Sequence, residues 1–377
     1  MSSLHTTSIT ATFRMLGARI SRTWYAESAE ARPFPLAIEY FLRAASEIYL
    51  AGLKLHQKKM RRDLRELPVK VVSVGNLTAG GTGKTPFTLW VALYLQDLGW
   101  SPAILSRGYG RKDTDGCRVV LDETPDLWVP RYGDEPVLLA RRAGDVPVWV
   151  GRDRCRSGKE AMKQGADLLV LDDGFQYLTL ERHLDFVLLD SRRPLGNGRL
   201  LPWGPLREPA NHLTRADALI LTRAERESGQ GQAREMIAGA FPSRPVFSCR
   251  YRLGGFSVGF QRERVPKEVL QREPVIAFAG IARPDSFSES LEEAGIHPLC
   301  FLSYPDHHPY RKSDLEAILQ TAKRKKASFV LTTEKDWVRI PQEFQQVVLA
   351  AALEIDFGHD LSKIQAFIRD RLSPPVP

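Results

Sequence analysis

The sequence predicts an α/β protein with a mostly parallel sheet, followed by a second, smaller α/β domain. Short apolar strand patterns alternate with helical patterns along most of the chain, as they do in parallel sheets. A strand–loop–helix pattern restarts at Val275, which favours a second domain. The chain has 377 residues, of which 43% are hydrophobic and 26% are charged, so it is long and apolar enough to bury a core. We therefore expect one domain over residues 67–244 and a smaller one over residues 245–377.

Cysteine usage points to a reducing, cytoplasmic setting. The chain has four cysteines, and none of them forms a C-x-x-C pair. Neither a zinc site nor a disulfide framework is therefore expected.

The positive charge is concentrated near the N-terminus. The chain carries a net charge of +8, and residues 1–70 hold 12 Lys and Arg against 6 Asp and Glu. Nucleic-acid binding would spread basic residues over a folded face, so no nucleic-acid partner is expected. An anionic membrane surface explains a basic N-terminal segment as well.

Residues 34–66 predict an amphipathic helix after a polar extension, residues 1–33, for which we expect little order. The helix is mostly apolar from Leu36 to Leu55, and Glu39, Arg43 and Glu47 form one polar stripe. These charges argue against a simple membrane-spanning helix. Two interpretations stay open: a helix packed on the core, or an interfacial helix whose basic end lies among lipid headgroups. The basic residues of that end are Lys54, Lys58, Lys59, Arg61 and Arg62.

A glycine-rich turn between a strand pattern (69–76) and a helical pattern predicts a phosphate-binding loop. The turn reads T-A-G-G-T-G-K-T, with Lys-Thr directly after the last glycine. Its amides can point at phosphate oxygens, Lys84 adds a positive charge, and the hydroxyl of Thr85 can ligate Mg²⁺. Thr78 stands where the usual pattern has its first glycine, and the pair Gly80-Gly81 can supply the backbone freedom instead. The alternative is a turn that merely connects strand and helix. The candidate nucleotide-binding residues are Thr78, Ala79, Gly80, Gly81, Thr82, Gly83, Lys84 and Thr85.

Two acidic pairs are candidates for metal binding. Asp172 and Asp173 follow a buried strand at its carboxyl end, where ligands bind in open α/β sheets. Asp134 and Glu135 precede a helical run, and such a pair alone is typical of a helix start. Beside a phosphate loop, the second pair becomes a candidate for metal or base chemistry.

An arginine-rich segment follows the strand at residues 186–189. It contains Arg192, Arg193, Arg199 and Arg207 within a Gly- and Pro-rich loop. Arginines in an irregular segment can bind an anionic substrate, although a solvated loop has the same composition.

The segment Y-P-D-H-H-P-Y places two histidines beside Asp306. Three interpretations remain open for His307 and its neighbour: metal ligands, an acid/base group oriented by a carboxylate, or a loop histidine satisfied by hydrogen bonds.

Taken together, the motifs closely resemble those of the tetraacyldisaccharide 4′-kinase family of lipid A synthesis. They are V-G-N-L-T-A-G-G-T-G-K-T-P, S-R-G-Y-G-R-K, G-D-E-P-V-L-L-A-R-R, L-V-L-D-D-G-F-Q, L-L-P-W-G-P-L-R-E-P, A-F-A-G-I-A-R-P-D-S-F, D-H-H-P-Y and T-T-E-K-D-W, in this order. The resemblance runs from about Pro35 to the C-terminal region. It implies a P-loop NTPase-like core, a smaller C-terminal α/β domain and a membrane-associating N-terminal helix. It also implies ATP and Mg²⁺, and an acylated glucosamine disaccharide 1-phosphate as substrate.

The resemblance further implies roles for single residues. Asp134 and His307 match an Asp–His pair that helps to deprotonate the 4′-hydroxyl, with Lys84 as a third catalytic residue. The metal would be held by Thr85, Glu135, Asp172 and Asp173, and the substrate by Arg107, Asn197, Arg199 and Arg207. The family tolerates a residue other than glycine at the position of Thr78. Tyr177 and His183 depart from the family pattern, which reads D-D-G-F-Q-H and R-D-L-D there.

The implied setting is the cytoplasmic face of the inner membrane, in peripheral or monotopic association, with no obligate protein partner. A P-loop GTPase or ATPase metallochaperone is the main alternative, since T-R-A-E (222–225) faintly resembles the guanine-reading T-K-x-D. Arg and Glu replace the Lys and Asp of that motif, and no Cys/His delivery site is evident. A membrane adaptor without activity is the second alternative.

Overall fold

The computed structural model describes Trp24 and residues 35–109, 111, 116–122, 124–224, 230–259 and 262–372. The predicted extension over residues 1–33 lies outside this part, apart from Trp24. The chain divides into two compact units, described separately below. Unit 1 comprises Met1–Glu66, Gly75–Thr82 and Phe175–Ser248, and unit 2 comprises Leu67–Val74, Gly83–Gly174 and Cys249–Pro377. The domain boundaries expected at 66/67 and 244/245 stay a prediction.

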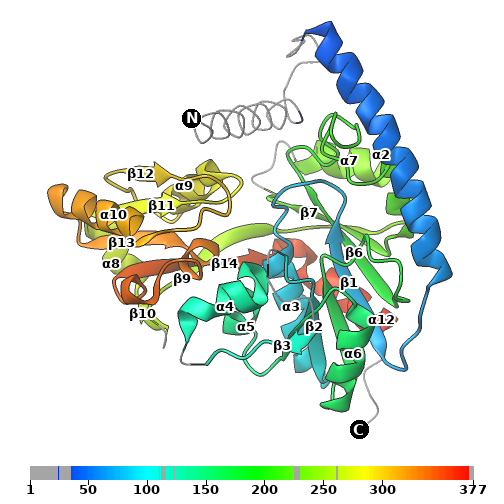
Figure 1. Cartoon of the computed structure of the whole chain (residues 1–377), viewed down its shortest axis with the longest axis horizontal. Coiled ribbons are helices and arrows are strands. Elements are labelled where there is room, and N and C mark those ends of the chain that lie inside the picture. Colours follow the sequence, from blue (N-terminus) through cyan, green and yellow to red (C-terminus); the bar gives the residue numbers. More distant parts are fainter. Residues whose placement is uncertain are drawn as a thin grey trace, which may run out of the picture. The chain divides into compact units, whose positions relative to one another are not determined.

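The N-terminal part of unit 2 forms the predicted mostly parallel sheet, with strand order β3-β4-β2-β5-β1. Figure 1 labels β1, β2 and β3 of this sheet. β1, β5, β2 and β4 pair in parallel, and β3 pairs antiparallel with β4. The strands are β1 (Lys70–Asn76), β2 (Pro102–Ser106), β3 (Cys117–Arg118), β4 (Val148–Val150) and β5 (Leu168–Asp172). The helices are α3 (Lys84–Asp97), α4 (Pro125–Tyr132), α5 (Asp134–Arg142) and α6 (Arg154–Lys163). The predicted order of strand, glycine-rich loop and helix is confirmed, because β1 leads through that loop into α3.

The C-terminal part of unit 2 forms a six-stranded sheet in the order β10-β9-β14-β13-β11-β12. The strands from β14 to β12 are parallel, whereas β9 runs antiparallel to β14 and β10. Its elements are β9 (Arg250–Val258), β10 (Glu263–Val265), α8 (Lys267–Arg272), β11 (Val275–Ala279), α9 (Pro284–Glu293), β12 (Phe301–Ser303), α10 (Lys312–Arg324), β13 (Phe329–Thr333), α11 (Glu334–Trp337), β14 (Val348–Asp356) and α12 (Leu361–Arg371), with short 3₁₀ turns at Gln342–Phe344 and Gly358–Asp360. The predicted restart at Val275 is confirmed as β11. A core that includes Phe256, Phe287 and Leu331 fills this part.

Unit 1 contains three parallel strands in the order β6-β7-β8. They are β6 (Leu184–Asp190), β7 (Ala218–Thr222) and β8 (Val246–Ser248), with the helix α7 (Gln230–Ala240) and a 3₁₀ turn at Ala210–Arg215. Leu77, Phe175, Val187 and Ile237 belong to its apolar core. β7 ends at Thr222, the first residue of the T-R-A-E segment. Glu225, the last residue of that segment, lies outside the described residues.

The predicted N-terminal helix is confirmed as α2 (Leu36–Arg62), one uninterrupted helix of 27 residues in unit 1 (Figure 1). One of its faces packs on the 200–208 segment through hydrogen bonds. Ser46 Oγ donates to the carbonyl of Leu200 at 3.1 Å, and Tyr49 Oη donates to that of Arg207 at 2.8 Å. Gln57 Nε2 donates to Glu208 Oε2 at 2.8 Å. The inner face of α2 is therefore fixed largely by polar contacts.

The outer face of α2 is apolar and exposed. Phe41, Ile48 and Leu55 recur every seven residues, so they lie on one face. Their exposed fractions are 70%, 74% and 71%. Of the two interpretations of this helix, core packing thus accounts only for the inner face. Across the described residues, we find no helix with both the length and the apolar character needed to cross a membrane.

Candidate active site

In unit 1, side chains hold the first half of the phosphate loop through hydrogen bonds to its carbonyl groups. Asn76 Nδ2 donates to the carbonyls of Thr78 and Gly80, at 2.7 and 3.4 Å. Arg223 Nη2 donates to the carbonyl of Gly81 at 2.8 Å. Gly80 has a φ of 113°, a conformation that residues with a Cβ rarely adopt. Of the glycine pair, Gly80 thus adopts a backbone conformation that requires glycine.

Two of the predicted nucleotide-binding residues are engaged within unit 1. Thr78 is buried and forms a β-bridge with Leu206, while the amide of Ala79 donates to the carbonyl of Pro205 at 2.7 Å. That amide therefore points at protein rather than at a ligand. Phosphate contacts from the loop backbone are left to the residues that follow Ala79.

The second half of the loop, in unit 2, leads into α3. Gly83 is the N-cap of α3 with a φ of 80°, and its carbonyl accepts from Tyr251 Oη at 2.9 Å. A Cβ on residue 83 would lie 2.1 Å from the hydroxyl oxygen of Tyr251, so only glycine fits at this position. Lys84 and Thr85 form the first turn of α3, where amides without helical partners and the helix dipole favour an anion.

The acidic pair at the end of β5 lies beside Lys84. Lys84 Nζ is 3.4 Å from Asp173 Oδ1. Asp172 is buried, and its carboxylate accepts from Thr88 Oγ1 at 3.1 Å and from Ser106 Oγ at 3.3 Å. Burial, together with the negative charges of Glu135 and Asp173, raises the pKa of Asp172 to about 7. The positive charges of Lys84 and Arg154 oppose this rise but do not cancel it.

Asp134 and His307 meet, although 173 residues separate them. His307 Nδ1 lies 2.8 Å from Asp134 Oδ2. Asp134 begins α5 and is 8% exposed, whereas His307 lies on the loop after β12 with 49% of its side chain exposed. Of the three interpretations of His307, the geometry supports a histidine oriented by a carboxylate.

The charges around this pair shift both pKa values. Burial would raise the pKa of Asp134, but the hydrogen bond from His307 and the charges of Lys335, His307 and Arg339 lower it overall. The hydrogen bond to Asp134 raises the pKa of His307, although burial and the charge of Lys335 oppose the rise. Lys335 Nζ lies 3.4 Å from His307 Nε2 and 3.6 Å from Glu135 Oε1.

A buried carboxylate, Asp336 of α11, holds the loop that carries His307. Asp336 Oδ1 accepts from the amide of Gly280, from Tyr310 Oη and from Arg339 Nη2, each at 2.9 Å. The carbonyl of Gly280 in turn accepts from the amide of His307 at 3.1 Å and from Arg339 Nη2 at 3.1 Å. His307, with a φ of 55°, is thus held on its backbone side by Gly280 and on its ring by Asp134.

The predicted substrate-binding residues fall in both units, with Arg107 in unit 2 and the other three in unit 1. In unit 1, Asn197 Nδ2 donates to the carbonyl of Trp203 at 3.0 Å, and the guanidinium of Arg199 lies 3.5 Å from the centre of the Trp203 ring. Arg207 is half-buried in unit 1, and Arg107 is exposed after β2 in unit 2. Their role in substrate binding stays a prediction.

Sequence reasoning missed several residues that support the site. Lys335, Asp336 and Arg339 follow Thr333, whose Oγ1 accepts from the amide of Asp336 at 3.1 Å as the N-cap of α11. The spacing T-x-x-D was a visible capping signal, but it does not reveal the burial of Asp336 or its partners. No group of three or more His, Cys, Asp or Glu side chains placed to hold a metal ion occurs within the described ranges.

Comparison with known proteins identifies the family. A family model described as tetraacyldisaccharide-1-P 4′-kinase matches residues 38–373. The chain belongs to the tetraacyldisaccharide-1-P 4′-kinase family. This match does not favour the metallochaperone alternative.

Relatives of this kinase family match over most of their length. The tetraacyldisaccharide 4′-kinase of Syntrophobacter fumaroxidans is 43% identical over 356 residues, which cover 94% of this chain and 93% of that protein. That of Syntrophus aciditrophicus is 42% identical over 338 residues, covering 86% and 89%. The crystal structure of Aquifex aeolicus LpxK in complex with ATP aligns with a TM-score of 0.68 at 30% identity, over 89% of this chain and 99% of that one. The P-loop NTPase-like fold expected from the sequence is confirmed.

Asp336→Asn tests the support of the His307 loop in this kinase. The substitution removes the negative charge that faces Arg339 in the core, and breaking a buried ion pair costs about 3 kcal/mol of unfolding free energy. Denaturant titration should show a loss of that order. Asp356→Asn is the control, because Asp356 pairs with Arg250 at 2.7 Å on the surface and such pairs contribute about 1 kcal/mol or less. Equal losses in the two variants would contradict the role given to Asp336.

Proposed function

We propose that this chain is an ATP-dependent kinase that phosphorylates the 4′-hydroxyl of an acylated glucosamine disaccharide 1-phosphate. The product is the 1,4′-bisphosphate, lipid IVA, and the reaction belongs to lipid A biosynthesis. Family membership supports the reaction, and the hydrogen bond between His307 and Asp134 is the observation that carries it in this structure. An alcohol attacks phosphorus well only if its proton has somewhere to go, and this pair supplies an acceptor.

The tautomer of His307 determines which nitrogen does this work. With Asp134 accepting the hydrogen bond, Nδ1 carries the proton of the neutral ring. Nε2 is then the basic nitrogen, on a side chain that is 49% exposed and so accessible to substrate. Nε2 takes the proton of the 4′-hydroxyl while that oxygen bonds to the γ-phosphorus. The bond from phosphorus to the oxygen bridging the β- and γ-phosphates breaks, and ADP leaves.

Lys84 and the start of α3 are the groups that we propose for the triphosphate. Lys84 is paired with Asp173 at 3.4 Å, and this distance is long for a salt bridge with direct hydrogen bonding. Lys84 can therefore exchange this partner for phosphate oxygens at little cost. Phosphoryl transfer depends mainly on positioning and on neutralising charge, and the loop and Lys84 provide both.

The acidic residues fit a magnesium ion held together with the nucleotide. Burial raises the pKa of Asp172 to about 7, and the charges of Glu135 and Asp173 add to the rise, which Lys84 and Arg154 only partly oppose. A further cation would therefore favour its ionised form. Mg²⁺ usually takes only one or two protein carboxylates and completes its shell with phosphates and water, so no larger cluster of ligands is needed. Thr85, Glu135, Asp172 and Asp173 are the proposed ligands. The metal would neutralise charge on the phosphates during transfer.

The 1-phosphate of the substrate is the group that we assign to the basic side chains. Arg107, Asn197, Arg199 and Arg207 are the proposed contacts. Arg199 rests on Trp203, which orients its guanidinium without neutralising it, so its charge stays available to an anion. Guanidinium groups bind phosphate through paired hydrogen bonds, which fits a substrate that carries one phosphate before the reaction.

The outer face of α2 is the proposed membrane-binding surface. Phe41, Ile48 and Leu55 expose a continuous apolar stripe, and the exposed residues Lys58, Lys59 and Arg62 continue the same face by helical spacing. An apolar stripe that ends in basic residues is suited to the boundary between acyl chains and anionic headgroups. We place the protein at the cytoplasmic face of the inner membrane on this basis, in peripheral or monotopic association. No obligate protein partner and no nucleic acid enter this proposal.

A phosphate-transfer assay tests the proposed function directly. The purified protein is mixed with ATP labelled at the γ-phosphate, Mg²⁺, and tetraacyldisaccharide 1-phosphate in mixed micelles. Transfer of label to the lipid is the expected result. Nucleotide hydrolysis that is indifferent to the lipid, and faster with GTP, would instead support the metallochaperone alternative.

Lys84→Ala should lower kcat by about 10²- to 10³-fold, because a preorganised positive charge on the transferring phosphate is lost. Steady-state lipid phosphorylation measures the effect, and circular dichroism checks the fold. Lys159→Ala, at an exposed position on α6, should keep normal turnover. A Lys84→Ala enzyme with near-normal kcat would refute the assignment.

Asp134→Asn should change the pH dependence as well as the rate. His307 accepts a proton only when neutral, and its pKa is raised, so kcat/KM falls as pH drops through that raised value. Without the charge of Asp134 the pKa of His307 falls, and the acid limb of the profile should move to lower pH. The rate should also fall by about 10²- to 10⁴-fold.

A neighbouring pair provides the control for this experiment. His308 Nε2 lies 3.1 Å from Asp314 Oδ2, so Asp314→Asn makes the same chemical change beside the other histidine. That variant should keep the wild-type rate and acid limb. If the acid limb of Asp134→Asn stays where the wild-type limb lies, His307 is not the titrating base.

Ile48→Glu should release the protein from vesicles that contain anionic lipid. Burying a large aliphatic side chain is worth about 1.5–3 kcal/mol, so the substitution should weaken vesicle binding by at least about tenfold. Flotation or sedimentation of vesicles measures the bound fraction. Val347→Glu is the matched control, since Val347 is also exposed, at 52%, but lies outside α2. Unchanged binding of Ile48→Glu would contradict the proposed surface.

A further inference from the structure

Arg223 occupies an unusual backbone position directly after β7. Its φ is 54°, in the left-handed region that residues other than glycine seldom adopt. Ser191 Oγ donates to its carbonyl at 2.8 Å and holds this conformation. Strained backbone of this kind persists where the surrounding structure enforces it, and it is common at functional sites.

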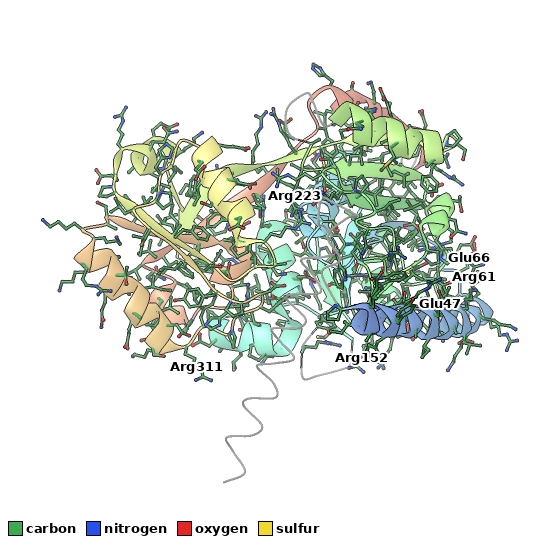
Figure 2. The ribbon with its side chains drawn as sticks, turned by 90° about the horizontal axis from the view of Figure 1, so that it is seen from above. Glu47, Arg61, Glu66, Arg152, Arg223 and Arg311 are labelled. Atoms are coloured by element: carbon green, nitrogen blue, oxygen red, sulfur yellow. The ribbon has the colours of Figure 1, made fainter. Side chains whose placement is uncertain are left out.

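Arg223 is labelled in Figure 2. Its side chain links two parts of unit 1. Nη1 lies 2.6 Å from Oδ2 of Asp190, the last residue of β6, and the Asp190 side chain is only 5% exposed. Nη2 donates to the carbonyl of Gly81 in the phosphate loop at 2.8 Å. Because both terminal nitrogens are engaged, the guanidinium is placed to hold the loop rather than to read a nucleotide base.

A donor that fixes the carbonyl of one residue also fixes the direction of the N–H group of the following residue, because both belong to the same planar peptide. In a trans peptide the C=O and the following N–H point in opposite directions. Arg223 therefore directs the amide of Thr82 away from itself. Asn76 has the same effect one peptide earlier, since its contact to the carbonyl of Gly80 directs the amide of Gly81.

The glycine pair makes such a restraint necessary. A Cβ built on Gly80 or on Gly81 would meet no atom within 4 Å, so side-chain packing does not restrain either peptide. Glycine samples more backbone conformations than any other residue, and ordering it on binding would weaken affinity. A fixed donor removes this cost before the ligand arrives.

We propose that Arg223 is a positioning residue of the phosphate loop, which fixes the Gly81 peptide so that the loop amides are oriented for the β-phosphate of a nucleotide. Thr78 replaces the usual first glycine of this loop, and Arg223 restrains the glycine pair that takes over its flexibility. This inference rests on the nucleotide binding proposed above.

Nucleotide affinity measured with and without a β-phosphate tests the proposal. Isothermal titration with Mg²⁺ compares ADP with AMP for the wild type, Arg223→Met, Arg223→Lys and Arg244→Met. Arg244 is the matched control because its Nη2 donates to the carbonyl of Thr214, at 2.5 Å, instead of to the loop. Thermal unfolding shows whether each variant is folded.

Arg223→Met should weaken ADP binding by about tenfold while AMP binding stays unchanged, as expected for the loss of a charged hydrogen bond. Arg223→Lys should fall in between, since one ammonium cannot bridge Asp190 and Gly81 as the guanidinium does. Arg244→Met should match the wild type. If Arg223→Met fails to fold, Arg223→Lys tests the proposal instead. Its ratio of ADP affinity to AMP affinity should then lie below the wild-type ratio.

Two outcomes would overturn the inference. In one, the Arg223 variants keep the wild-type preference for ADP over AMP within about twofold, which is near the precision of such titrations. In the other, ADP and AMP binding weaken equally, because a restraint on the loop cannot affect a ligand that lacks the β-phosphate. If the wild-type protein bound neither nucleotide, that result would refute the proposed function itself. It differs from the two outcomes above, in which the wild type still binds ADP.

Discussion

The hydrogen bond between Asp134 and His307 depends on much of unit 2 being in place. Asp134 sits at the first position of α5, so the packing of α5 on α4, α3 and β4 determines where its carboxylate lies. His307 sits on a loop of the C-terminal sheet that Gly280 and Asp336 anchor from below. In the proposed mechanism, the imidazole of His307 has a defined orientation only while Asp134 holds it. The bond thus makes the chemistry conditional on correct packing between segments 173 residues apart.

The phosphate loop shows the complementary constraint. An amide of the loop faces an anion only while the carbonyl of the same trans peptide points the opposite way. In unit 1, Arg223 donates a hydrogen bond to the carbonyl of Gly81. In unit 2, Tyr251 donates one to the carbonyl of Gly83. Arg223, after β7, and Tyr251, in β9, thereby restrain peptides of a glycine-rich backbone that would otherwise be free to turn.

Local patterns were sufficient to predict the strand–loop–helix unit, the start of α5 at Asp134 and the acids at the end of β5. Each of these depends on neighbours within one turn or one strand. The roles of Asp336 and Arg223 depend on distant partners, which a single sequence does not reveal. Strand pairing was likewise beyond reach: β9 pairs antiparallel with β14, about one hundred residues later, and no local pattern identifies that partner. The resemblance to a family predicted the pairing of Asp134 with His307, which spacing alone left open.

Asp134 and Asp172 show how one unit gives two buried acids different tasks. Burial pushes both pKa values upward. Asp134 is surrounded by His307, Lys335 and Arg339, which more than compensate, and it stays ionised as the partner of an imidazole. Asp172 is buried beside two hydroxyls, and the charges of Lys84 and Arg154 do not offset its burial and the neighbouring acids, so its pKa stays high. When the environment shifts the pKa values of two similar groups in opposite directions, the groups are suited to different roles. Here Asp134 is suited to orienting the proposed base, and Asp172 is suited to the proposed metal.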